Sequence, residues 1–166
     1  IRPQSPVVGT GMEASVAESM GWVVKSDFPG TIISVDANSI ELELDKDVVA
    51  KAKEFYAGSI NEHAIFNKGR VTYSSIKFHR TAGSTCYNQK PVVKVGDKVK
   101  KGDLLIDGPA SDGGELSLGR NLVIAYASFM GLGYEDAIIV SDKLVKEDVL
   151  TSIHINEYTA DIMDTK

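Results

Sequence analysis

Two adjacent carboxylates, Glu135 and Asp136, are the residues of this sequence best suited to chemistry. They follow a glycine-containing segment, residues 131–134, and precede the apolar run of residues 137–140. A charge pair between buried strands costs desolvation free energy unless a cation or hydrogen-bond donors compensate it. Carboxylate oxygens at a strand edge suit magnesium, particularly where substrate phosphates supply its remaining ligands. The pattern alone leaves open the alternative that both residues are ordinary surface acids.

The other residues capable of chemistry form no comparable pattern. His63, His79 and His154 are far apart in the sequence, with no cysteine or carboxylate at zinc-ligand spacing, so we expect no zinc site. Cys86 has no base nearby and is interpreted as a small packing residue. The Gly-x-Gly pair at residues 9–11 lacks the third glycine and the ribose-binding acid of a dinucleotide site.

A basic cluster is formed by Lys94, Lys98, Lys100 and Lys101. Such a cluster is usually a solvated turn surface, and no aromatic residue is interleaved with it as a platform for single-stranded nucleic acid requires. The whole chain carries 18 basic and 23 acidic side chains, a formal net charge of −5. Bulk charge therefore argues against a strongly basic nucleic-acid binder or a polybasic membrane protein. Contact with nucleic acid would need a local basic patch or a bound metal.

Length and composition indicate one soluble globular unit. A chain of 166 residues corresponds to about one domain, and 43% hydrophobic with 25% charged residues argues against wholesale disorder. The single cysteine favours a reducing, cytoplasmic location, and we find neither a signal peptide nor an apolar run long enough to span a membrane. Because the sequence begins at Ile1 rather than methionine, we expect an internal segment of a longer protein.

The elements that must position the acidic pair are mostly short strands. Ile40, Leu42 and Leu44 alternate with acidic residues, and the β-branched residues 31–35 precede them across a turn, which predicts a hairpin. The continuous apolar run of residues 121–127 predicts a strand buried on both faces. We expect further strands over residues 22–24, 71–78 and 151–163.

Short helices complete the predicted fold. We expect them over residues 12–20, 47–56 and 142–149, the last with Ser141 as its N-cap. The polar, glycine-containing residues 79–89 predict a loop or an irregular strand pair. The fold class is therefore mainly all-β with two or three short helices.

Residues 92–106 contain two Gly-Asp turns six residues apart, which predicts tight turns joined by very short strands. This pattern resembles the barrel–sandwich hybrid fold of biotinyl and lipoyl carrier domains. A carrier needs an exposed lysine at a hairpin tip, and the turn at Asp36-Ala37 has none beside it. The sequence therefore lacks the key residue of a carrier.

Longer strings of residues carry a more specific resemblance. They are VVGTGME (7–13), TCYNQKP (85–91), DGPASDGGELSLGRN (107–121), GYEDAII (133–139), LVKED (144–148), TSIHINEY (151–158) and the terminal DTK. In this order they resemble the β subunit of bacterial DNA-directed RNA polymerase. The resemblance covers nearly the whole chain and is weakest over residues 46–75.

The resemblance implies a segment from the middle of a much longer subunit. It implies the first half of a double-psi β-barrel, into which a barrel–sandwich hybrid module is inserted. We expect the module at residues 25–108 and the strands of the incomplete barrel at residues 1–24 and 109–166. The hairpin at residues 31–45 and the Gly-Asp segment at residues 92–106 should then share one core.

The resemblance also implies a role for the acidic pair. Glu135 and Asp136 would face the second magnesium and the incoming nucleoside triphosphate, with Asp136 reaching that magnesium directly or through water. The resemblance implies that an aspartate triplet of the β′ subunit holds the first magnesium, and this sequence has no such motif. The implied partners are the β′ and α subunits, the DNA template and the RNA product, with no membrane. We expect the isolated chain to be inactive; a stand-alone barrel–sandwich interaction or carrier module is the alternative.

Overall fold

A hairpin forms the centre of the computed structural model, which describes residues 1–58 and 63–162. Strands β2 (Gly30–Val35) and β3 (Ser39–Leu44) pair antiparallel, as the alternating pattern predicts. In the turn, Asp36 Oδ1 accepts hydrogen bonds from the backbone N–H groups of Asn38 (2.7 Å) and Ser39 (2.8 Å). These hydrogen bonds lower the pKa of Asp36. The aspartate thus closes the turn that sets the register of the hairpin.

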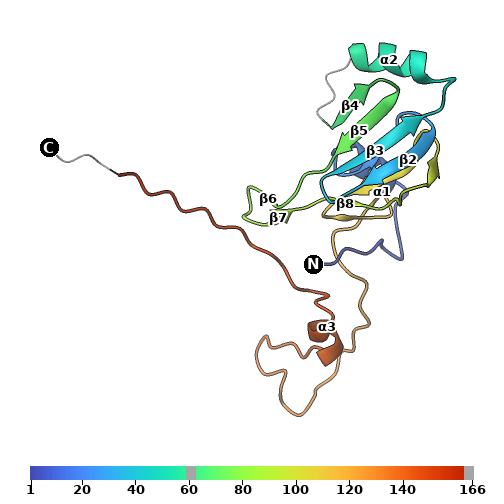
Figure 1. Cartoon of the computed structure of the whole chain (residues 1–166). Coiled ribbons are helices and arrows are strands. Elements are labelled where there is room, and N and C mark those ends of the chain that lie inside the picture. The colour runs from blue at the N-terminus through green and yellow to red at the C-terminus, as the bar shows by residue number, and fades with distance from the viewer. Residues whose placement is uncertain (59–62, 163–166) are drawn as a thin grey trace.

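The hairpin belongs to a five-stranded antiparallel sheet in the order β4-β5-β3-β2-β9 (Figure 1). Its other strands are β4 (Ala64–Asn67), β5 (Arg70–Ser74) and β9 (Lys98–Val99). A second sheet has the order β1-β10-β8 and consists of β1 (Val24–Lys25), β10 (Leu104–Asp107) and β8 (Lys90–Pro91). The predicted strand at residues 71–78 therefore ends earlier, at Ser74, and the one at residues 22–24 begins later, at Val24.

One hydrophobic core joins the two sheets. Ile32, Leu42 and Val71 form a buried cross-strand row on the large sheet. The same cluster contains Leu105 and Ile106 of β10. Fully burying side chains of this size stabilises the fold by roughly 1.5–3 kcal/mol each. The expectation that the hairpin and the Gly-Asp segment share a core is therefore confirmed, and we call this two-sheet unit the body.

The predicted helices are present but shorter. They are α1 (Glu13–Ser19), α2 (Val49–Ala57) and α3 (Asp142–Lys146). Ser141 caps α3, because its hydroxyl accepts the backbone N–H of Lys143 at 3.3 Å. Two small hairpins complete the elements, β6 (His79–Arg80) with β7 (Cys86–Tyr87) and β11 (Ser111–Asp112) with β12 (Glu115–Leu116). The described residues thus confirm a mainly all-β fold with short helices; they contain no closed barrel, and the double-psi barrel and the module boundaries stay predictions.

Two predicted strands are wrong. Residues 121–127 belong to no strand and are exposed, and residues 151–162 make only one isolated bridge, between Thr85 and His154. Residue 163, which ended the second prediction, lies outside the described residues. An apolar run becomes a buried strand only where neighbouring strands bond its backbone and cover its side chains. Within residues 1–58 and 63–162 nothing covers residues 121–127 in this way. In the same described ranges, no helix is long and apolar enough to cross a bilayer.

Gln89 connects three parts of the body. Its side chain is completely buried; Oε1 accepts the backbone N–H of Ile76 at 2.8 Å, and Nε2 donates to the carbonyl oxygen of Trp22 at 3.1 Å. A buried amide with its groups bonded costs little, whereas an unsatisfied one costs about 1–3 kcal/mol. Gln89 therefore holds the segment that precedes β1 beside the connection that follows β5.

Gly30 provides a test of the sheet packing. It lies between Leu44 of β3 and Val99 of β9, and a Cβ atom there would overlap the carbonyl oxygen of Glu43. We predict that Gly30→Ala lowers the free energy of unfolding by about 1–3 kcal/mol, as overpacking does. Urea unfolding followed by circular dichroism measures this loss.

The matched control is Gly83→Ala, because a Cβ atom at Gly83 meets nothing within 4 Å. Equal stability of the two variants would contradict the close approach of β2 to the backbone of β3.

Candidate functional site

The acidic pair lies on a long arm, residues 122–140, that leaves the body before α3 (Figure 1). Glu135 and Asp136 are the two central residues of a turn in which the N–H of Ala137 donates to the carbonyl oxygen of Tyr134 at 3.4 Å. Glu135 has a φ of +58°, the left-handed region that non-glycine residues rarely adopt. Both acids are exposed, and neither makes an ion pair with any described residue.

This geometry corrects the expected surroundings of the pair. Residues 137–140 are exposed and form no strand, so the two carboxylates do not lie between buried strands within the described chain. Within the described chain the two carboxylates are therefore exposed, and no desolvation cost requires a cation to compensate it. Adjacent residues of a strand point to opposite faces. Because Glu135 and Asp136 lie in a turn, that rule does not tell which of the two would face a metal.

The two ends of the arm are held by the N-terminal segment. The backbone N–H of Gln4 donates to the carbonyl oxygen of Gly119 at 3.0 Å, and the N–H of Arg2 donates to that of Val149 at 3.2 Å. The first residues therefore bridge the segments on both sides of the arm and α3.

The arm itself carries large apolar side chains that nothing in the described residues covers. Val123, Tyr126, Met130 and Ile138 each expose more than 85% of their surface. Their number and closeness exceed what isolated apolar residues on a soluble surface show. This segment therefore presents an apolar surface on which another polypeptide segment can pack.

The donor set of the acidic pair fits magnesium only in part. Carboxylate oxygens are the hard ligands that magnesium prefers, and it commonly takes one or two of them beside substrate phosphates. The described residues hold no group of three or more potential ligands. Glu135 and Asp136 thus suit a shared magnesium site and do not form a complete one.

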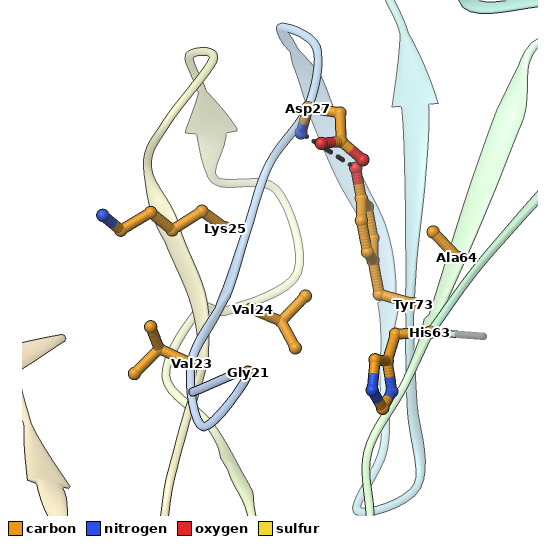
Figure 2. A pocket seen from close by; sticks show the side chains of 8 residues that line it. All are labelled: Gly21, Val23, Val24, Lys25, Asp27, His63, Ala64 and Tyr73. Atoms are coloured by element: carbon orange, nitrogen blue, oxygen red, sulfur yellow. Dashed lines mark hydrogen bonds between the residues drawn. The ribbon is translucent and has the colours of Figure 1, made fainter. Parts of the chain in front are cut away.

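A second candidate, the small pocket in Figure 2, is structural. Its volume is about 160 Å³, below the range of ordinary ligand pockets. Tyr73 extends toward Asp27, whose backbone N–H donates to the tyrosine hydroxyl at 3.1 Å. The Tyr56 hydroxyl donates to Asp27 Oδ2 at 2.6 Å, and burial together with this bond raises the pKa of Tyr56. The carboxylate of Asp27 therefore ties α2 to the segment between β1 and β2, and its backbone N–H ties the same segment to Tyr73 of β5.

Sequence reasoning missed two carboxylates that order their own loops. Glu13 accepts the backbone N–H groups of Thr10 at 2.6 Å and Gly11 at 2.9 Å, and these bonds lower its pKa to about 2. The spacing Thr-x-x-Glu is that of a capping box and would have indicated it. Buried Asp107 accepts the N–H of Gly113 at 2.8 Å and the hydroxyl of Ser111.

Comparison with known proteins assigns the chain to a family. Residues 46–166 match the family model described as RNA polymerase Rpb2, domain 6. The whole chain is 42% identical to the DNA-directed RNA polymerase subunit beta of Thermosynechococcus vestitus and 45% identical to that of Geobacter sulfurreducens. The chain belongs to the RNA polymerase β-subunit family.

The match to this family includes the arm and both acidic residues. It also includes residues 46–75, where the resemblance was weakest. The chain spans 13% of the length of the Thermosynechococcus subunit and 11% of the Geobacter subunit. It therefore corresponds to a segment of the β subunit, as the strings predicted.

Glu13 yields a prediction about acid stability. Its folded pKa of about 2 lies below the ordinary value of 4.5, so its contribution to stability is present above about pH 4.5 and is lost as the pH falls toward 2. We predict that Glu13→Gln removes this part of the acid dependence of unfolding. Urea unfolding between pH 2 and pH 5 measures it.

Glu54→Gln on α2 is the control, since the Glu54 carboxylate makes no hydrogen bond with the described residues. The same acid dependence in wild type and Glu13→Gln would show that the loop bonds of Glu13 are not maintained in solution.

Proposed function

We propose that this chain forms part of the active-site cleft of a DNA-directed RNA polymerase and presents Glu135 and Asp136 toward the incoming nucleoside triphosphate. Identity of 41–45% along the whole chain to subunits of that name carries the proposal. The reaction is DNA-templated RNA synthesis, a nucleotidyl transfer. The enzyme would be cytoplasmic and include the β′ and α subunits, a DNA template and the RNA product.

The exposed arm supports a role inside a larger assembly. A segment with side chains as exposed as Val123 and Tyr126 gains free energy when another surface buries them, at about 25 cal/mol per Å² of apolar area. We propose that the rest of the β subunit or a partner subunit covers the arm and thereby fixes the acidic turn. The same exposure counts against the alternative of a stand-alone carrier or interaction module.

The contacts of the N-terminal segment support the proposed domain arrangement. Residues 1–24 and 109–166 would be strands of a double-psi β-barrel, and residues 25–108 the inserted barrel–sandwich hybrid module. The bonds from Arg2 to Val149 and from Gln4 to Gly119 join the two flanks although the whole body separates them in the sequence. Such bonds between the two flanks are what the proposed arrangement requires.

The chemistry of the pair follows from its charge. Phosphoryl transfer depends on positioning and on neutralising the charge of the phosphates, and magnesium supplies that neutralisation when bound. Asp136, and beside it Glu135, would hold the second magnesium directly or through water. The left-handed conformation of Glu135 turns the backbone so that one short turn presents both carboxylates.

Asp136→Asn in a complete polymerase tests the proposal. The change keeps the shape and removes the charge, so we expect nucleotide addition to require more magnesium and more nucleotide. The expected loss of transition-state stabilisation is about 1–3 kcal/mol. Glu135→Gln should act in the same direction and more weakly, because the family resemblance assigns the metal contact to Asp136. Single-nucleotide addition rates against magnesium and nucleotide concentration measure both.

The matched control is Asp47→Asn, at an exposed position on the body just before α2. An unchanged magnesium dependence for Asp136→Asn, together with a lower melting temperature, would show that the pair is structural and would overturn the proposal.

The isolated chain should not extend a primer. Its described residues contain no group of three potential metal ligands, which supports the proposal that partner subunits supply the ligands of the first magnesium. Primer extension with the purified chain at high magnesium concentration is the measurement. Extension above the background of an Asp136→Asn chain would contradict the assignment of that chemistry to partner subunits.

A further inference from the structure

The four clustered lysines form one edge of the body. Lys98 lies in β9, the edge strand of the five-stranded sheet, and Lys94, Lys100 and Lys101 lie in the turns on either side of it. All four are exposed. We call these four residues the lysine edge.

The backbone directs this edge outward. Lys98 pairs with Thr31 of β2, whereas the next residue, Val99, pairs with Gly30 and is buried in the core. Because side chains alternate along a strand, Lys98 projects from the outer face of the sheet. On that face, Glu43 opposes Thr31 and lies 3.6 Å from Arg70, so the nearest acid in this cross-strand row already has a basic partner.

The acids of the two Gly-Asp turns are engaged with the backbone. Asp97 Oδ2 accepts the N–H of Lys94 at 2.7 Å, and Asp103 Oδ2 accepts the N–H of Lys100 at 2.7 Å. None of the four lysine ammonium groups forms an ion pair with a described residue. Residues 94–103 carry a formal charge of +2, in a chain whose total is −5.

Protection of the sheet edge does not account for the cluster. Lysines on edge strands prevent pairing with other chains, but only Lys98 lies in the strand. In the turns, the N–H of Gly96 donates to the carbonyl oxygen of Ile32 at 2.8 Å, and the N–H of Gly102 donates to that of Ser26 at 2.7 Å. The turn backbone is therefore paired already, so edge protection does not explain the lysines in the turns.

We propose that the lysine edge binds the phosphate backbone of duplex DNA. The inference rests on the proposed function, which supplies DNA as a partner, and adds a contact surface away from the acidic pair. Phosphate contacts need flexible cations and no base recognition. Residues 92–103 contain no aromatic side chain on which an unpaired base could stack, which favours the duplex over a single strand.

The test measures how salt affects DNA binding by a polymerase that contains this chain. Fluorescence anisotropy with a labelled duplex that lacks promoter sequence gives the association constant at each KCl concentration. The measured quantity is the slope of the logarithm of that constant against log [KCl], which we call the salt slope. Each lost phosphate contact reduces the steepness by about 0.9, so Lys98→Gln with Lys100→Gln should reduce it by about two. Lys51→Gln with Lys53→Gln, at exposed positions on α2, is the charge-matched control and should leave the slope unchanged.

Three outcomes would overturn the proposal. The first is a salt slope that the lysine substitutions leave unchanged. The second is the same unchanged slope together with larger aggregates of the variant, which would mean that the lysines only protect the sheet edge. The third is a change of the salt slope with single-stranded DNA but not with duplex DNA. If the strand variant fails to assemble, Lys94→Gln with Lys101→Gln alters only the turns and should give the same reduction.

The acidic pair separates this proposal from the proposed function. Asp136→Asn should keep the wild-type salt slope and change the magnesium dependence. If Asp136→Asn alters the magnesium dependence and the lysine substitutions leave the salt slope unchanged, the proposed function stands and the DNA-binding surface is refuted. If Asp136→Asn leaves the magnesium dependence unchanged and the lysine substitutions reduce the salt slope, the role of the acidic pair is refuted and the DNA-binding surface stands.

Discussion

The core that joins the two sheets is the contact on which the rest of the body depends. Ile32 and Leu42 on one sheet pack in the same cluster as Leu105 and Ile106 on the other, although some sixty residues separate the two segments. Beside this core β9 pairs with β2, and the Gly-Asp turns lie on either side of β9. Gln89 bonds the connection that follows β5, at Ile76, to the segment that precedes β1, at Trp22. Because these contacts are distant in sequence, folding must close long loops before it gains burial.

Stability and proposed function lie in different parts of the chain. The body contains most of the buried apolar residues, whereas the arm with Glu135 and Asp136 contains none. Substitutions in the arm should therefore alter what the chain contacts more than whether it folds. The lysine edge is intermediate, because its turns are fixed by the core while its side chains extend into solvent.

The sequence predicted those features whose cause is local. The alternation at Ile40, Leu42 and Leu44 gave the hairpin, and Ser141 marked the start of α3. The strand expected at residues 121–127 failed because no described strand pairs with its backbone and nothing in the described residues covers its side chains. The family and the candidate acids came from ordered strings of residues. The left-handed turn at Glu135 and the buried bonds of Gln89 depend on tertiary context, which no spacing reveals.

The bridging of both ends of the arm by the first residues has a consequence for its length. With Gly119 and Val149 held through Gln4 and Arg2, the intervening segment is a closed loop whose entropy changes slowly with size. Doubling such a loop costs only about 0.6 kcal/mol. Insertions or deletions within the arm would thus leave the body nearly undisturbed. The arm can therefore vary in length while the body that carries it stays the same.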